Sequence, residues 1–198
     1  MKTGILLSGG MDSAALSWWK RPDIAFTIDY GQLAAEAEIQ AATTIARRVP
    51  LEHHIIKVDC RALGSGDMAG NAADNYAPAS DWWPYRNQLL VTLTAMKAIT
   101  LGVVHIFLGS VKSDALHRDG TIEFVDALSK LLEMQEGALR VEAPAIDMST
   151  VELIRASGIS SAELAWCHSC HTSNVSCGSC RGCYKYFNVF EEIGYGLD

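Results

Sequence analysis

The stretch ILLSGGMDSAAL at residues 5–16 constrains the fold more than any other part of the chain. An apolar, strand-like run ends at Ser8, two glycines follow, and Asp12 and Ser13 open a stretch with helical periodicity. Glycines let backbone N–H groups approach an anion closely because no Cβ intervenes, and a helix N-terminus adds unpaired donors and partial positive charge. The two serines can donate further hydrogen bonds, whereas Asp12 is suited to hold Mg²⁺. The stretch therefore predicts a phosphate-binding strand–loop–helix; the alternative is a simple turn whose Ser or Asp caps the next helix.

Strand-like and helix-like segments alternate along the rest of the chain. Strand patterns occupy residues 3–7, 23–28, 51–58 and 103–109, with a weaker one at 140–144, and helical periodicity occupies roughly 12–20, 34–48, 86–101 and 121–136. This alternation predicts an α/β, Rossmann-like fold in which helices cover both faces of a parallel sheet. Residues 60–84 break the rhythm and predict a long functional or mobile loop. The alternative is a disordered insertion, although Trp82 and Trp83 argue against it.

Composition and charge narrow the function classes. A chain of 198 residues, 49% of them hydrophobic, can form one soluble domain, and no apolar run reaches the ~20 residues of a membrane span. The N-terminal apolar run is too short for a signal peptide, so we expect a cytoplasmic protein. A net charge of −7 argues against a nucleic-acid partner. No G-x-x-x-x-G-K-[ST] or G-x-G-x-x-G motif is present, which argues against γ-phosphate transfer and a dinucleotide ligand.

Polar residues follow three of the predicted strands or open the next helix. Ligands bind at the carboxyl ends of parallel strands, so we expect candidate site residues in IDYGQ, in WPYRN and in GSVKSDALHRDG. An Arg at a helix start can form paired hydrogen bonds with a phosphate or carboxylate. The candidates are Asp29, Tyr30, Gln32, Arg86, Asn87, Lys112, Asp114 and Asp119. Taken alone each segment also fits an ordinary strand end or helix start, and Asp119 could cap a helix that begins near Gly120.

Five of the six cysteines lie between residues 167 and 183. In a reducing compartment such a cluster favours metal over disulfides, and Cys170, Cys177, Cys180 and Cys183 could close a tetrahedral shell. An iron–sulfur cluster also accepts four thiolates, but Gly178 and Gly182 suit zinc-knuckle turns, so we expect a structural Zn²⁺. Cys167 could replace Cys170 as the first ligand, and His168 and His171 are further candidates.

Taken in order, these motifs resemble the 7-cyano-7-deazaguanine synthases, the QueC family of PP-loop (N-type) ATP pyrophosphatases. The resemblance rests on SGGMDS, on DYGQ followed by an acid at Glu36, on WPYRN, on GSVKSDALHRDGTIEF and on CGSCRGC, and it covers nearly the whole chain. It implies a HUP-type α/β domain (residues 1–158) with a zinc-binding segment (159–198), a homodimer, ATP, Mg²⁺ and Zn²⁺. The implied reaction adenylates 7-carboxy-7-deazaguanine and converts it with ammonia, through the amide, to the nitrile.

The resemblance also implies roles for individual residues. The implied nucleotide-binding residues are Leu7, Ser8, Gly9, Gly10, Met11, Asp12, Ser13, Asp29, Tyr30 and Gln32. The implied substrate-binding residues are Arg86, Asn87, Lys112, Asp114 and Asp119, and the implied catalytic set is Asp12, Ser13, Arg86 and Asp114. No covalent nucleophile is implied; catalysis is by positioning and charge stabilisation.

The chain departs from the family pattern at the substrate end. His117-Arg118-Asp119-Gly120 stands where the family commonly has Tyr-Pro-Asp-Cys, Leu33 replaces a basic residue, and a Lys typical near Thr150 is missing. These departures predict, as an alternative, a paralogue that adenylates a deazapurine acid and passes it to another amine, such as a protein acceptor, in nucleobase modification or antiviral defence. A tRNA-thiolating PP-loop enzyme and a non-catalytic nucleotide-binding module are weaker alternatives.

Overall fold

A computed structural model describes residues 1–194, and a five-stranded parallel sheet forms its centre. The strands are β1 (Lys2–Leu6), β2 (Ile24–Asp29), β3 (Glu52–Lys57), β4 (Val103–Phe107) and β5 (Arg140–Glu142), in the spatial order β3-β2-β1-β4-β5. Each predicted strand is present, and their boundaries differ from the predicted ones by at most two residues. The predicted α/β fold with a parallel sheet is confirmed.

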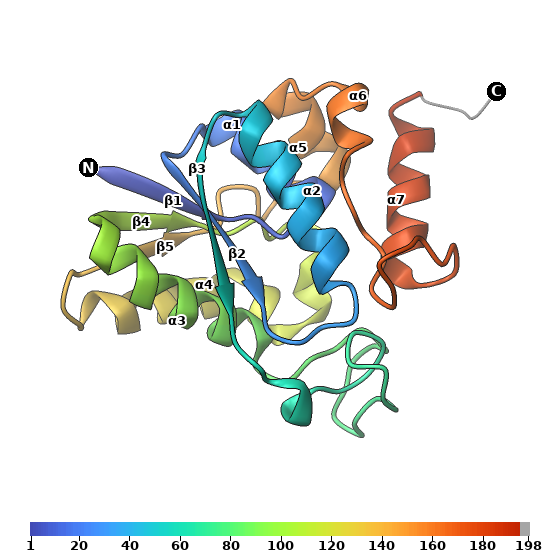
Figure 1. Ribbon diagram of the computed structural model, residues 1–198, viewed down its shortest axis with the longest axis horizontal. Helices are drawn as coiled ribbons and strands as arrows, with labels where there is room; N and C mark the ends of the chain where they lie inside the picture. Colours follow the sequence, from blue (N-terminus) through green and yellow to red (C-terminus); the bar gives the residue numbers. More distant parts are fainter. Residues whose placement is uncertain (195–198) are drawn as a thin grey trace.

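Helices cover both faces of this sheet (Figure 1). One face carries α1 (Met11–Lys20), α2 (Ala35–Arg48), α5 (Thr150–Ser157), α6 (Ser161–Leu164) and α7 (Arg181–Glu192), and the other carries α3 (Arg86–Ala98) and α4 (Ile122–Glu133). The buried side chains form one apolar cluster on each face: Ile5, Leu16 and Leu153 belong to the first, and Phe26, Val91 and Leu128 to the second. Short 3₁₀ turns span Arg61–Leu63, Ile99–Leu101, Lys112–Leu116 and Arg118–Gly120.

The order of the strands fixes where a ligand can bind. β1 lies between β2 and β4, so the chain winds in one direction from β1 to β3 and in the other from β4 to β5. Neighbouring connections therefore diverge at the carboxyl ends of β1 and β4, which leaves a crevice there. The loop at residues 7–10 joins β1 to α1 at this point.

The helices beyond residue 149 were not among the predicted elements. Ser149 caps α5, because its Oγ accepts from the Glu152 N–H at 3.2 Å while Glu152 Oε2 accepts from the Ser149 N–H at 2.7 Å. This Ser-x-x-Glu pattern is a helix-start signal that the sequence contains. The predicted helix 86–101 ends at Ala98 and continues as a 3₁₀ turn.

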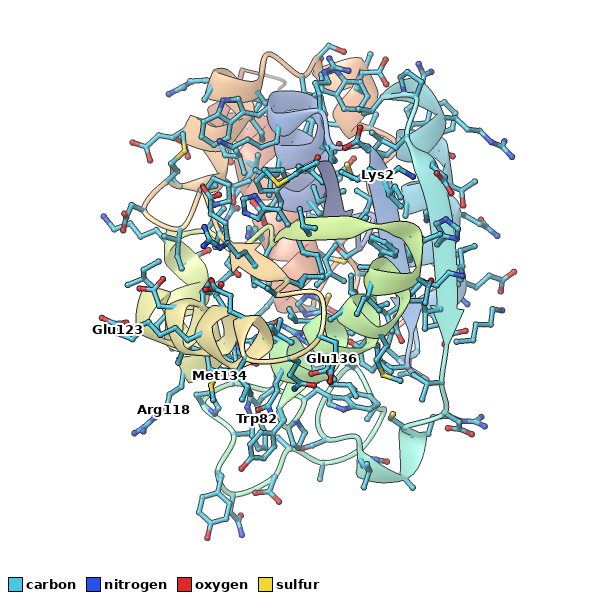
Figure 2. All side chains as sticks on the ribbon, turned by 90° about the vertical axis from the view of Figure 1, so that its left-hand side faces the viewer. Lys2, Trp82, Arg118, Glu123, Met134 and Glu136 are labelled. Carbon is cyan, nitrogen blue, oxygen red and sulfur yellow. The ribbon has the colours of Figure 1, made fainter. Side chains whose placement is uncertain are left out.

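Residues 60–84 form a loop whose Ser65, Met68 and Trp83 are buried, whereas residues 70–76 are exposed. The Trp83 side chain is only 2% exposed, and its ring meets the Tyr30 ring edge-on at a centroid distance of 4.8 Å. Trp82 lies in the lower part of the molecule as drawn in Figure 2. Across residues 1–194, none of the helices combines the length and the apolar character needed to span a membrane.

Candidate functional site

A cavity of about 870 Å³ opens at the carboxyl ends of β1 and β4. It brings together most of the residues that the sequence singled out, from segments that are far apart along the chain. The predicted residues that line it are Leu7, Ser8, Gly10, Met11, Asp12, Ser13, Tyr30, Arg86, Asn87, Lys112, Asp114 and Asp119. Gly9, Asp29 and Gln32 are not among its lining residues.

The loop between β1 and α1 forms one end of the cavity. α1 begins after Gly10, which is the N-cap and carries no side-chain cap, so the turn does not have the capping Ser or Asp of the simpler alternative. The Oγ atoms of Ser8 and Ser13 lie 3.2 Å apart, and Ser13 Oγ donates to the Gly10 carbonyl at 3.0 Å. The open helix start and the two hydroxyls place hydrogen-bond donors at this end, as an anion requires.

Gly9 is needed for the shape of this loop. Its φ is +85°, and a Cβ there would lie 2.6 Å from the Glu38 carbonyl oxygen and 2.9 Å from Ala41 Cβ. Any larger residue would therefore push α2 away from the loop. Gly9 packs against α2 and is not among the residues that line the cavity.

Asp12 has two partners that sequence reasoning missed. Thr150 Oγ1, at the start of α5, donates to Asp12 Oδ1 at 2.7 Å. Lys185 Nζ, on α7, donates to Asp12 Oδ2 at 2.7 Å. Both residues line the cavity, so the Asp12 carboxylate is held in place by two helices from the C-terminal part of the chain.

The far end of the cavity contains a guanidinium with no carboxylate partner. Arg86 Nη1 lies 3.0 Å from Met68 Sδ, and within residues 1–194 Arg86 takes part in no ion pair. Tyr30 packs beside it, and burial raises the pKa of the Tyr30 hydroxyl well above its usual value. Asp119, Asp81 and Asp114 act on its charge only from beyond ion-pair distance, so the guanidinium remains suited to bind an anionic ligand.

Glu38 is the acid that lines this end, whereas Glu36, which the resemblance indicated, is exposed. Glu38 Oε2 accepts from Gln32 Nε2 at 2.7 Å. Burial raises the pKa of the Glu38 carboxyl group, although Gln32 and Arg86 act in the opposite direction. The cavity thus holds a titratable acid close to an Arg.

The side chains of Gln32 and Asp29 form hydrogen bonds with backbone groups of the turn after β2. Gln32 Oε1 accepts from the Tyr30 N–H at 2.9 Å, and Gln32 Nε2 also donates to the Ile28 carbonyl at 3.2 Å. Asp29 Oδ1 accepts from the Gly31 N–H at 3.2 Å. Both side chains border a separate, smaller hollow, so they shape the turn that presents Tyr30.

Two further acids, Asp119 and Asp114, line the wall of the cavity between the loop after β1 and Arg86. Asp119 Oδ2 accepts from the Asn87 N–H at 3.1 Å, and Asn87 Nδ2 donates to the Asp119 carbonyl at 2.8 Å. Asp119 therefore contacts the first turn of α3; the helix near Gly120 begins at Ile122 and is capped by Thr121. Burial raises the pKa of Asp114.

Two basic residues of the same segment are exposed. Lys112 is exposed although it lines the cavity, and Arg118 projects away from the body (Figure 2).

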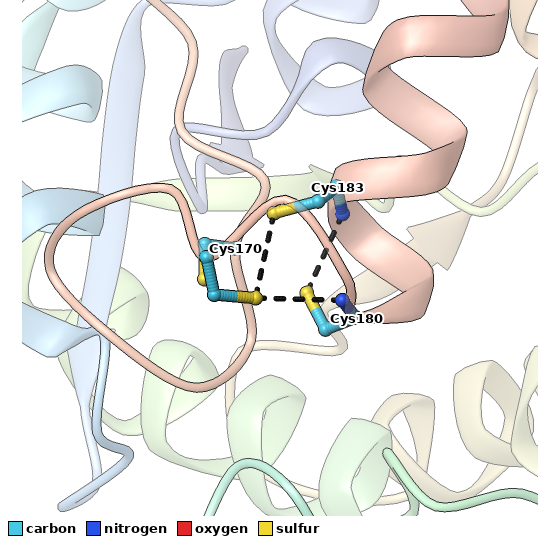
Figure 3. Close-up of side chains that lie close together, drawn as sticks. Cys170, Cys180 and Cys183 are labelled. Atoms are coloured by element: carbon cyan, nitrogen blue, oxygen red, sulfur yellow. Dashed lines mark hydrogen bonds between the residues drawn. The ribbon is translucent and has the colours of Figure 1, made fainter.

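The sulfur atoms of Cys170, Cys177, Cys180 and Cys183 all lie within 4.8 Å of one another. Figure 3 shows the cluster where the C-terminal loop meets α7. Backbone N–H groups donate to the sulfurs. Cys180 Sγ accepts from the N–H groups of His171 and Cys183, each at 3.4 Å. Cys177 Sγ accepts from the Cys180 N–H at 3.4 Å. Four convergent sulfurs that accept backbone hydrogen bonds fit a tetrahedral metal–thiolate site.

The structure selects Cys170 over Cys167 for this cluster. Cys167 packs against the core on the α1 face of the sheet, where burial and the Asp12 charge raise the pKa of its thiol to about 12. His168 and His171 are outside the four-residue group. A Cβ at Gly182 would run into the carbonyl of Ser169, so this position needs glycine.

The cysteine cluster and the cavity are physically connected. The His168 N–H donates to the Gly9 carbonyl at 2.9 Å, which ties the C-terminal segment to the loop after β1. Asp81, from the 60–84 loop, contacts Arg181 Nη1 at 2.6 Å and His171 Nδ1 at 3.5 Å.

Comparisons with known proteins agree with this geometry. The family model of the queuosine biosynthesis protein QueC matches residues 2–194. The chain is 34% identical to the 7-cyano-7-deazaguanine synthase of Desulforudis audaxviator over 67% of this chain and 69% of that protein. It is 32% identical to the 7-cyano-7-deazaguanine synthase of Thiobacillus denitrificans over 83% of this chain and 82% of that protein.

A solved structure shares the fold. The U34-tRNA thiolase NcsA from Methanococcus maripaludis, with its [4Fe-4S] cluster, superposes with a TM-score of 0.53 at 14% identity. The match covers 98% of this chain and 65% of that one. Since the family model spans nearly the whole chain and the motifs that carry the resemblance meet in one cavity, this chain belongs to the QueC family.

Proposed function

We propose that the protein is an ATP-dependent carbon–nitrogen ligase that makes 7-cyano-7-deazaguanine from 7-carboxy-7-deazaguanine and ammonia. The observation that carries the proposal is a single cavity that joins the donor-rich loop at Ser8–Ser13 to the unpaired guanidinium of Arg86. One end suits a triphosphate and the other an anionic planar substrate. The names of the similar synthases support the same reaction.

In the first step, a carboxylate oxygen of the substrate attacks the α-phosphorus of ATP. The bond between the α- and β-phosphates breaks, pyrophosphate leaves, and an acyl adenylate forms. The loop N–H groups and the Ser8 and Ser13 hydroxyls would stabilise the leaving pyrophosphate. Arg86 would orient the substrate carboxylate, with Asp119 and Asn87 forming the adjoining wall.

In the second step, ammonia attacks the adenylated carbonyl carbon and AMP leaves, which gives the amide. The amide oxygen then attacks the α-phosphorus of a second ATP and pyrophosphate leaves; loss of AMP together with the two N–H protons gives the nitrile. Asp114 lines the cavity between the two ends, and a carboxyl group there could accept a proton from the attacking amine. No step needs a covalent enzyme intermediate.

Two metals are part of the proposal. The Asp12 carboxylate lies at the loop and suits Mg²⁺, which would neutralise phosphate charge. The four clustered thiolates suit Zn²⁺ with a structural role, since four protein ligands leave no open position. We also propose that residues 1–158 form the nucleotide-binding domain and residues 159–198 the metal-binding segment; of the latter, 195–198 lie outside the described residues. The homodimer remains a prediction that light scattering can check.

The proposed reaction can be tested with purified protein, Mg·ATP, ammonia and 7-carboxy-7-deazaguanine. We expect AMP, pyrophosphate and a product with the mass of the nitrile. Arg86→Met should lower kcat/KM about a hundredfold or more, because it removes the charge that holds the carboxylate. Arg118→Met is the matched control, since Arg118 is exposed and outside the cavity. Absence of AMP and pyrophosphate from the wild-type reaction would contradict the proposal.

A second candidate is a paralogue that passes the adenylate to another amine. His117 stands at a position where the chain departs from the family pattern. Its side chain lines the cavity and lies 3.7 Å from Asp81. The substrate end therefore presents an imidazole that the family pattern does not have at this position. In the same assay, AMP and pyrophosphate without amide or nitrile would favour this candidate.

A further inference from the structure

Lys185 places a cation at the phosphate end of the cavity. It is on α7, two residues beyond Cys183, and its Nζ reaches Asp12 Oδ2 at 2.7 Å. The Lys185 side chain is 34% exposed and lines the cavity. It therefore has both a fixed starting position and room to move.

The carboxylate that holds this ammonium group is itself fixed in place. Lys185 Nζ donates to Asp12 Oδ2 at 2.7 Å, while Thr150 Oγ1 donates to Asp12 Oδ1 at 2.7 Å. Asp12 therefore supplies the counter-charge that keeps the Lys185 ammonium at the loop after β1.

The other Lys and Arg side chains that line the cavity in residues 1–194 have other partners or are exposed. Arg181 pairs with Asp81 at 2.6 Å, Arg86 lies beside Met68, and Lys112 is exposed on the 3₁₀ turn that follows β4. The loop itself supplies N–H and hydroxyl donors but no charged side chain other than the acidic Asp12. A bound triphosphate would therefore need a cation at the loop, and Lys185 is in that place.

We infer that Lys185 is a phosphate ligand, whose ammonium moves from Asp12 to a phosphate oxygen when Mg·ATP binds. The movement leaves the Asp12 carboxylate free to face the cation that accompanies the nucleotide. A lysine suits this role because its charge is compact and its four-carbon stem is flexible. The inference rests on the proposed ATP-dependent function and adds a C-terminal residue to the phosphate site.

Three variants test the inference: Lys185→Met, Lys185→Arg and the matched control Lys130→Met. Lys130 is exposed on α4 and outside the cavity. Calorimetry measures the Kd of Mg·ATP, and a ligand-observed NMR titration measures the Kd of adenosine, which carries no phosphate. We expect Lys185→Met to weaken Mg·ATP binding about ten- to a hundredfold while adenosine binding changes by less than about twofold. Lys185→Arg should restore part of the loss, and Lys130→Met should bind as the wild type does.

A structural role for Lys185 gives a different pattern. If Lys185→Met weakens adenosine as much as Mg·ATP, or leaves both unchanged while the wild type turns over, the inference is wrong and the proposed function stands. If the wild type binds no Mg·ATP, the proposed function and the inference fail together. Metal content and melting temperature, measured on each variant, show whether the cysteine cluster and the fold are retained.

Discussion

Glu36 and Glu38 are two residues apart on α2, but their surroundings differ. Glu36 is exposed, whereas Glu38 lines the cavity, accepts from Gln32 and has a pKa that burial raises above its usual value. In the folded protein the Glu38 carboxyl group therefore keeps its proton to a higher pH than in the unfolded chain. Since the unfolded chain then binds fewer protons, the free energy of unfolding falls as the pH rises through the interval between the two pKa values.

Glu38→Gln should remove this pH dependence. We expect the variant to gain stability relative to the wild type as the pH rises above the ordinary Glu value of about 4.3, by about 1.4 kcal/mol for each unit of pKa elevation. Urea unfolding of both proteins at a series of pH values measures the difference. Glu36→Gln, on the same helix, is the control and should show no such trend. A difference between wild type and Glu38→Gln that stays constant with pH would contradict the prediction.

At the scale of elements, the cysteine cluster fixes the start of α7. Cys180 is the N-cap of the helix, and its Sγ accepts from the Cys183 N–H at 3.4 Å. Cys170 and Cys177 come from the preceding loop, so a shared metal would join the loop to the first turn of the helix. Lys185 follows at the start of the next turn, two residues beyond Cys183, so its position depends on the cluster.

Removing one ligand should therefore loosen α7. Cys170→Ser should lower zinc content from about one ion per chain to near zero and speed amide hydrogen exchange in the first turn of α7. Cys167→Ser should keep the metal, because burial and the Asp12 charge raise the pKa of the Cys167 thiol to about 12 and only a thiolate is a good ligand. Elemental analysis measures the metal, and iron with a visible absorption band would contradict the zinc assignment. Metal loss in Cys167→Ser alone would contradict the ligand set.

Local patterns could predict the sheet, the loop after β1 and the set of cysteines, because each depends on neighbours in the sequence. The SGGMDS stretch contains the turn, the hydroxyls and the helix start together. Lys185 and Thr150 could not be found in this way, since they reach Asp12 across 173 and 138 residues. Glu38 was missed for a related reason: helical periodicity does not tell which of two nearby acids turns toward a cavity built by other segments.

At the scale of the whole molecule, Asp81 joins three distant segments. Its carboxylate contacts Arg181 at 2.6 Å, His171 at 3.5 Å and His117 at 3.7 Å. Burial raises the pKa of Asp81, but these three contacts outweigh it and hold the pKa below its usual range. The ionised Asp81 carboxylate, with its contacts, therefore stabilises the fold above the ordinary Asp pKa, and this stabilisation is lost progressively as the pH falls below it.

Asp81→Asn should loosen the 60–84 loop and the cysteine segment together. We expect a loss of about 1–3 kcal/mol at neutral pH, because the Asp81 side chain is 10% exposed and the Arg181 guanidinium would lose its counter-charge. Hydrogen exchange should rise in residues 60–84 and also in residues 168–183, which are separate in sequence. Asp74→Asn is the control, since Asp74 is exposed in the same loop and accepts from the Tyr76 N–H. The difference in free energy of unfolding between the wild type and Asp81→Asn should become smaller below about pH 4. Faster hydrogen exchange that is confined to residues 60–84 would show that Asp81 does not couple the two segments.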